Sequence, residues 1–135
     1  MLDLANVVYP AEPGDRLAQQ AEELREQIRC GYSELLRQRR ACEELQRRVD
    51  SEEQRGVALP WKVLAYVQMD NRRGAWLAAL ELDQVRTLLE ADRRRLRESR
   101  QAYHDHAVRL AADRQRLGEL QRQLLRLEPH VRFAS

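Results

Sequence analysis

Apolar residues recur along the first part of the chain at alternating steps of four and three. From Leu17 to Val49 this spacing places eight apolar residues at ten positions, with Gly31 counted as non-apolar. Such a repeat keeps one narrow stripe, or seam, facing a partner helix, as in a coiled coil. Asp15 suits the start of the helix and Gly56 suits its end. The pattern predicts a helix over residues 15–55.

A second repeat with the same spacing begins at Trp61 and runs to Leu127 without a change of register. Pro60 is suited to the first turn of a helix, where its missing N–H costs nothing, and Pro129 lies just past the last repeat position. We therefore expect a second helix over residues 60–128. Residues 1–14 then form an N-terminal segment and residues 129–135 a C-terminal tail.

The two predicted helices are separated only by residues 56–59. A link this short makes consecutive helices antiparallel neighbours. We therefore expect an all-α fold, a two-helix antiparallel coiled-coil hairpin with a longer second helix, over residues 15–128. Gly74 offers an alternative, because a break there would divide the second helix and give three helices, although a lone glycine costs only about 1 kcal/mol in a helix.

A hairpin folded about residues 56–59 leaves part of its second helix without a neighbour. At 1.5 Å per residue, residues 102–128 would overhang the first helix by about 40 Å. Residues 2–9 are apolar enough to fold over the first turns of this overhang. The remaining seam leucines need a partner, a second copy or a surrounding ring. These leucines are Leu110, Leu117, Leu120, Leu124 and Leu127.

The stretch over residues 59–80 differs from the rest of the chain in its density of apolar and aromatic residues. In the predicted register several of them face away from the seam. These residues are Val63, Tyr66, Met69, Trp76, Leu77 and Leu80. Contiguous exposed apolar surface of this kind marks interaction sites, and Trp and Tyr are frequent anchors there. The alternative is a local helical bundle formed by self-association.

Composition and charge narrow the function further. The chain is 34 % charged and 5 % aromatic, which is typical of long helices, and its net charge of +2 argues against nucleic-acid binding. Five arginines lie between Arg93 and Arg100. This cluster predicts either a contact with an acidic protein or phosphate, or a solvated helix face balanced by acids of the first helix.

Candidate chemistry is sparse. Cys30 and Cys42 are too far apart in one helix for a disulfide and indicate free thiols in a reducing compartment. His104 and His106 fall on different helix faces, so we expect no shared metal. The sequence contains no phosphate loop, no nucleophile with a base at a suitable spacing, no secretory signal and no apolar membrane span. We expect a non-enzymatic, soluble cytoplasmic protein without catalytic residues, metal or cofactor.

A small, charged hairpin with a short turn and a longer second helix resembles the type III secretion stalk proteins of the YscO/InvI/FliJ-like family. The resemblance covers residues 15–128, and the stretch WKVLAYVQ at residues 61–68 is similar to the aromatic-rich start of the second helix in that family. It implies a coiled-coil stalk for protein transport and virulence. Such a stalk inserts its paired termini into a hexameric ATPase and contacts the export gate or secretion chaperones near the turn.

On this resemblance the leucines of the overhang face the ATPase, and the outward residues over 63–80 contact the gate or a chaperone. The protein is then a monomeric hairpin in the cytoplasm, peripheral to a membrane-bound secretion apparatus. The alternative is a generic homo-oligomeric coiled-coil adaptor or scaffold, which pairs its exposed stripes with a second copy. The two classes differ in the oligomeric state that they predict.

Overall fold

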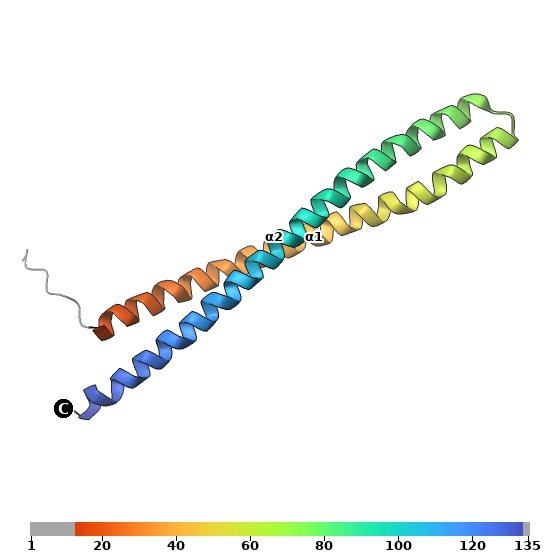
Figure 1. The fold of residues 1–135 in the computed structure, drawn as a ribbon. Helices are drawn as coiled ribbons and strands as arrows, with labels where there is room; N and C mark the ends of the chain where they lie inside the picture. The colour runs from red at the N-terminus through yellow and green to blue at the C-terminus, as the bar shows by residue number, and fades with distance from the viewer. Residues whose placement is uncertain (1–12, 134–135) are drawn as a thin grey trace, which may run out of the picture. The chain divides into compact units, whose positions relative to one another are not determined.

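The computed structural model describes residues 13–133, with side chains described through residue 127. Two helices, α1 (Pro13–Gln68) and α2 (Arg72–Phe133), account for this part of the chain apart from the turn at residues 69–71. They pack against each other as an antiparallel hairpin (Figure 1). The predicted all-α hairpin is therefore confirmed. Helix α2 is the longer, with 62 residues against 56 in α1.

The predicted helix boundaries are wrong at the turn. Helix α1 does not end at residue 55 but continues through the expected turn at residues 56–59 to Gln68. Residues 60–68, expected to begin the second helix, are the last turns of the first. At the other end, residues 129–133 belong to α2 rather than to a separate tail. The helix also begins at Pro13, so that Asp15 lies in its first turn.

The continuation of α1 has a physical reason in its seam. Beyond Val49 the alternating spacing persists without interruption, and each position it reaches is buried or half-buried. These positions are Glu52, Gly56, Leu59, Val63 and Tyr66. A glycine in a helix costs about 1 kcal/mol and an interior proline about 3 kcal/mol. Tertiary packing of the continued seam outweighs these local costs at Gly56 and Pro60.

The chain reverses at residues 69–71 through a specific helix C-cap. Asp70 has a φ of 54°, in the left-handed region. The Asp70 N–H donates to the Val67 carbonyl at 3.1 Å, and the Asn71 N–H donates to the Tyr66 carbonyl at 2.8 Å. This pair of bonds is a Schellman motif, which satisfies carbonyls that the end of a helix would otherwise leave unpaired.

The same turn also starts α2. The Asn71 side-chain oxygen accepts a hydrogen bond from the Gly74 N–H at 2.9 Å, so Asn71 is the N-cap of α2. A Cβ on Gly74 would stand 2.6 Å from Cδ1 of Tyr66, so only glycine lets the aromatic ring lie here. Gly74 is thus the third residue of α2 and not a break inside a helix. The three-helix alternative is wrong.

The hairpin consists of two compact units. The first, which we call the end unit, contains the described residues 13–34 of α1 and 106–133 of α2. Its seam closes around apolar side chains from both helices. Its buried apolar residues are Ala21, Leu24, Ile28, Leu110 and Leu120.

The second unit, which we call the turn unit, spans Leu35–Asp105 and includes the chain reversal. It is built from the same alternating seam. Its buried apolar residues are Val49, Leu59, Ala78, Val85 and Leu96. Asp92 is buried among them although it is charged.

The overhang expected for residues 102–128 is absent from the described chain. Because the turn lies at residues 69–71 rather than 56–59, α1 reaches far enough to cover these positions. Leu110 and Leu120 are buried and Leu117 and Leu124 are half-buried. Leu127 is partly exposed, with its Cδ1 atom 3.8 Å from where a Cβ on Gly14 would stand. The expected cover by residues 2–9 lies outside the described residues.

Candidate functional site

The largest departure from an ordinary coiled coil is the exposed apolar surface of the turn unit. Trp61 is 70 % exposed and Trp76 is 62 % exposed, and their neighbours include other exposed apolar side chains. Single exposed apolar residues are common on proteins, but contiguous groups of them mark interaction sites. This surface is our candidate functional site.

Bonds between the helices show which sides of α1 and α2 adjoin. Arg93 forms an ion pair with Glu53 at 3.0 Å, and Arg100 donates a hydrogen bond to Gln46. Each of these four residues directly follows a seam position. Residues that directly follow a seam position in this way therefore line one flank of the hairpin. On α1, steps of seven residues continue this flank from Glu53 to Val67.

Exposed apolar side chains from both helices gather on this flank. Helical spacing places Val57, Leu64 and Val67 of α1 and Trp76 of α2 along this flank. Trp61 lies between Val57 and Leu64 at steps of four and three and continues the stripe outward. All five side chains are exposed. We call these five residues the tryptophan flank.

The other flank of the turn unit carries a second apolar group, all on α2. An ion pair between Arg55 and Glu81 marks this flank, and Leu88 follows Glu81 by seven residues. Leu77 precedes Glu81 by one helical turn, and Leu80 directly precedes Glu81. Leu77, Leu80 and Leu88 are all exposed. We call Leu77, Leu80 and Leu88 the leucine flank.

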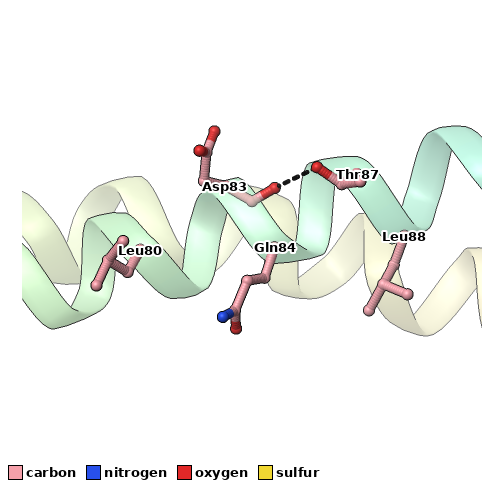
Figure 2. A pocket seen from close by; sticks show the side chains of 5 residues that line it. All are labelled: Leu80, Asp83, Gln84, Thr87 and Leu88. Carbon is pink, nitrogen blue, oxygen red and sulfur yellow. Dashed lines mark hydrogen bonds between the residues drawn. The ribbon is translucent and has the colours of Figure 1, made fainter.

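The leucine flank includes a shallow surface depression of about 450 Å³. Its lining residues are Leu80, Asp83, Gln84, Thr87 and Leu88. Figure 2 shows the side chains of Leu80, Gln84 and Leu88 projecting from the same side of α2. The Thr87 hydroxyl instead donates to the Asp83 carbonyl oxygen at 3.0 Å, so its hydrogen-bonding capacity is used within the helix. The depression therefore offers the Leu80 and Leu88 side chains and the Gln84 amide to a partner.

The charges around the tryptophan flank are few and mostly positive. Between residues 57 and 80 the basic residues are Lys62, Arg72 and Arg73, and the acidic residue is Asp70. Three positive charges and one negative charge give this stretch a net charge of +2. A rim of this sign favours a partner that presents acidic side chains around an apolar face.

The structure divides the six predicted interaction residues into two groups. Met69, Trp76, Leu77 and Leu80 are exposed, Met69 in the turn and the other three on α2. Val63 and Tyr66 were expected to face outward, and this expectation is wrong. Both lie in the seam of α1, where they are half-buried, because that helix and its repeat continue past residue 55.

The interaction residues predicted from the sequence do not include four members of the tryptophan flank, Val57, Trp61, Leu64 and Val67. They also do not include Leu88 of the leucine flank. Trp61 and Leu64 were assigned to the seam of the second helix, but both are exposed on α1. A usable signal was present in the sequence. Extending the first repeat in steps of four and three beyond Val49 places Val57, Trp61 and Leu64 outside the seam.

The arginine cluster is largely engaged within the hairpin. Arg93 and Arg100 bond to α1 as described above, and Arg95 forms an ion pair with Asp92 at 3.2 Å. Both partners of the Arg93–Glu53 pair are exposed, and such pairs contribute about 1 kcal/mol or less. These contacts favour the interpretation of the cluster as a solvated helix face with partners on the neighbouring helix.

The remaining candidates for chemistry lie in separate places. Cys30 is exposed and Cys42, half-buried, has its sulfur 3.0 Å from the Ser99 hydroxyl oxygen. His106 lies in the seam of the end unit, and its Nε2–H donates to the Gly31 carbonyl at 2.9 Å. Among the described residues no three His, Cys, Asp or Glu side chains are grouped so that they could hold a metal ion.

One polar layer in the seam of the turn unit is unusual. Asp92 is only 4 % exposed, and the Glu52 side chain lies against it from α1. The Oε2 atom of Glu52 is buried and has no hydrogen-bond partner. Burial, and then the neighbouring Asp92 carboxyl, raise the pKa of Glu52 above its ordinary value. This pair does not belong to either apolar flank.

Comparisons with protein-family models, curated proteins and solved structures found no match for this chain. Neither α1 nor the described length of α2 contains a window apolar enough to cross a membrane. The case for a function therefore depends on the surfaces of the hairpin.

Proposed function

We propose that the chain is a non-enzymatic coiled-coil stalk of a bacterial type III secretion export apparatus, in which the turn unit binds a second protein. The observation that carries the proposal is the apolar surface of the turn unit. Its seam residues already hold α1 and α2 together, so the exposed tryptophans and leucines are not required for the hairpin itself. Large aromatic side chains in this setting are suited to anchor a protein partner.

The chemistry of this surface favours one kind of partner. The tryptophan flank combines apolar side chains of two adjacent helices, and a third helix can pack against such a pair along its apolar stripe. The net charge of +2 over residues 57–80 favours acidic side chains at the margins of that stripe. We therefore propose a partner protein that presents an amphipathic helix with an acidic rim, as part of an export gate or a secretion chaperone.

The pairing of the helices in the end unit supports a further part of the proposal, namely that the stalk inserts this end into a hexameric ATPase. Members of the family that the sequence resembles insert paired termini into a hexameric ATPase, and in this chain the two helices are paired through the end unit. The leucines predicted to face the ATPase are instead buried or half-buried in the seam, apart from the partly exposed Leu127. Among the described residues of the end unit, the exposed large apolar side chains that could contact the ATPase ring are Tyr32, Val108, Leu125 and Leu127.

The test is reconstitution with the secretion ATPase of the same organism. The purified chain is expected to bind the ATPase and increase its turnover. Leu125→Glu in the end unit should weaken both effects, whereas Trp61→Glu in the turn unit should leave both unchanged. Conversely, Trp61→Glu should abolish binding of the gate or chaperone. If the wild-type chain neither binds the ATPase nor alters its turnover, the stalk proposal is wrong.

A homo-oligomeric adaptor is the second candidate, and the same exposed surface favours it. Two copies of the turn unit can cover each other's tryptophan flanks and form a local helical bundle. This candidate predicts a stable oligomer that Trp61→Glu or Trp76→Glu dissociates. The stalk predicts a monomer whose size is unchanged by either substitution.

A further inference from the structure

The seam of the turn unit contains two neighbouring carboxyl groups, those of Glu52 and Asp92, which belong to neither apolar flank. Glu52 occupies the seam of α1 where the repeat calls for an apolar residue, and Asp92 occupies the corresponding place in α2. A coiled coil of this sequence would gain stability from a leucine at either position. The pair is therefore a local weakness in the hairpin that depends on how it is protonated.

We propose that Glu52 and Asp92 form a proton-dependent latch, which closes the seam of the turn unit when one proton is held between the two carboxyl groups and weakens it when both are ionised. With one proton bound, the protonated carboxyl can donate a hydrogen bond to the other. With none bound, two negative charges lie close together in a buried layer. One proton is taken up from solvent on closing and returned to it on opening.

The geometry explains why the second ionisation is costly. Asp92 is nearly fully buried, and its carboxyl already accepts a hydrogen bond from Arg95 at 3.2 Å. The buried Oε2 atom of Glu52, by contrast, has no hydrogen-bond partner. Adding a proton to Glu52 therefore removes a charge that the layer does not compensate by hydrogen bonding.

Charged groups surround this layer on both helices. On α1, Arg48 and Arg55 act on Glu52 and favour its ionised form. On α2, the guanidinium of Arg95 is paired with Asp92. Glu53 and Arg93 pair with each other on the adjoining flank. The attraction of the arginines is smaller than the combined effect of burial and of the Asp92 carboxyl, so the pKa of Glu52 is raised overall.

The sign of the pH dependence follows from this direction. A carboxyl whose pKa is higher in the folded than in the unfolded chain binds its proton more tightly when folded. The stabilisation is fully present below the ordinary value of 4.5 and is lost as the pH rises through the higher folded-state pKa of Glu52. The latch therefore stabilises the closed turn unit at low pH and stabilises it progressively less as the pH rises through the folded-state pKa of Glu52.

A consequence for regulation follows only if the proposed function is correct. Both flanks lie in the turn unit. Along each helix, their residues lie between the latch residue, Glu52 or Asp92, and the chain reversal at residues 69–71. Opening of the seam there would change the spacing of Trp61 and Trp76, which come from different helices. Binding of a partner to the tryptophan flank would then depend on pH. The latch itself can be tested without any partner, so its failure is distinguishable from failure of the stalk proposal.

The experiment is urea unfolding of the full chain, followed by helical circular dichroism at several pH values from 4.5 to 8. At pH 8 Glu52→Gln is expected to raise the urea midpoint by roughly 0.5 M relative to wild type. At pH 4.5 the two midpoints should coincide. In the background of Asp92→Asn, the pH-dependent advantage of Glu52→Gln should shrink, because the second charge is gone. The matched control is Glu53→Gln, an exposed neighbour, which should follow the wild-type pH profile.

Hydrogen exchange locates the effect. At pH 8, amides of residues 56–90 should exchange faster in wild type than in Glu52→Gln, whereas amides of the end unit should exchange at the same rate in both. The comparison at one pH removes the intrinsic pH dependence of exchange. If the difference in urea midpoint between wild type and Glu52→Gln stays constant from pH 4.5 to 8, the latch does not exist.

Discussion

The end unit and the turn unit use the same seam but differ in what they leave exposed. In the end unit the repeat buries leucine, isoleucine and alanine, and among its described residues the exposed large apolar side chains are Tyr32, Val108, Leu125 and Leu127. In the turn unit the tryptophan and leucine flanks add two groups of exposed apolar residues outside the seam. Helix pairing does not explain this difference in exposed apolar residues, because buried seam residues pair the two helices in both units.

This comparison separates residues that hold the fold from residues that are available to a partner. Stability of the turn unit depends on seam residues such as Val85, which is almost completely buried. Its proposed interaction surface consists of residues that contribute little to stability because they remain in water in the folded state. Substitutions of seam residues should therefore lower stability. Substitutions of the exposed residues should lower binding of a partner and leave stability nearly unchanged.

The largest effect is expected from a charge placed in the seam. Val85→Asp puts an unpaired carboxylate in a buried layer and should cost about 3 kcal/mol or more of unfolding free energy. Leu80→Asp places the same charge on the leucine flank and should change stability by less than about 0.5 kcal/mol. Thermal unfolding of both variants measures the contrast. Equal losses would show that Leu80 belongs to the core.

The next effect contrasts glycines in the two units. Gly74→Ala in the turn unit would place a Cβ 2.6 Å from the Tyr66 ring, and we expect a loss of about 2 kcal/mol. Gly31→Ala in the end unit would meet Leu110 Cδ1 at 2.8 Å, the far end of a side chain that can turn, so the loss should be smaller. Gly118→Ala has nothing within 4 Å and should stabilise the hairpin by about 1 kcal/mol.

Urea unfolding of the three alanine variants gives the order directly. The predicted order of stability is Gly118→Ala first, then wild type, then Gly31→Ala, and Gly74→Ala last. A Gly74→Ala protein as stable as wild type would mean that the Tyr66 ring does not lie against the first turn of α2.

A smaller effect is expected at the cap of α2. Asn71→Ala removes the side-chain oxygen that accepts the Gly74 N–H, and such a loss typically costs about 1 kcal/mol. Asn71→Asp keeps an acceptor at the same place and serves as the matched control. The difference in unfolding free energy between these two variants measures the cap. If both variants lose the same amount, the hydrogen bond is not the source of the stability.

The smallest effect on stability is expected on the tryptophan flank. Trp61→Glu should change the unfolding free energy by less than about 0.5 kcal/mol, since the ring is already largely in water. The same substitution should abolish binding of a partner that uses this flank. Lys62→Gln, at the next position, removes only a charge and should weaken binding without abolishing it. Unchanged affinity in the Trp61 variant would remove the flank from the interface.

Much of the fold could be predicted because the seam is regular. The repeat from Leu17 to Val49 and the repeat from Ala75 to Leu124 both lie in the seam of the structure. The turn could not be placed from local signals, because Gly56 and Pro60 are usual at helix boundaries yet lie inside α1. The true turn uses Asp70 in a left-handed conformation and Asn71 as a cap, a weaker signal than glycine or proline.

The candidate site was only partly predictable for the same reason. Trp76, Leu77 and Leu80 belong to α2 in either interpretation, so the outward position predicted for them agrees with their exposure. Val63 and Tyr66 moved to the seam when α1 was extended, and Trp61 moved out of it. The repeat spacing happens to continue across the turn from Trp61 to Ala75, and the periodicity by itself therefore does not reveal where one helix ends.

The central claim is that the hairpin is complete by itself and keeps the tryptophan flank free for a different protein. Light scattering coupled to size exclusion, over a wide range of protein concentrations, tests this claim most directly. The account predicts a mass of 15.9 kDa at every concentration, for wild type and for Trp61→Glu alike. A wild-type dimer that Trp61→Glu converts to a monomer would contradict it, because the flank would then bind a second copy of the chain.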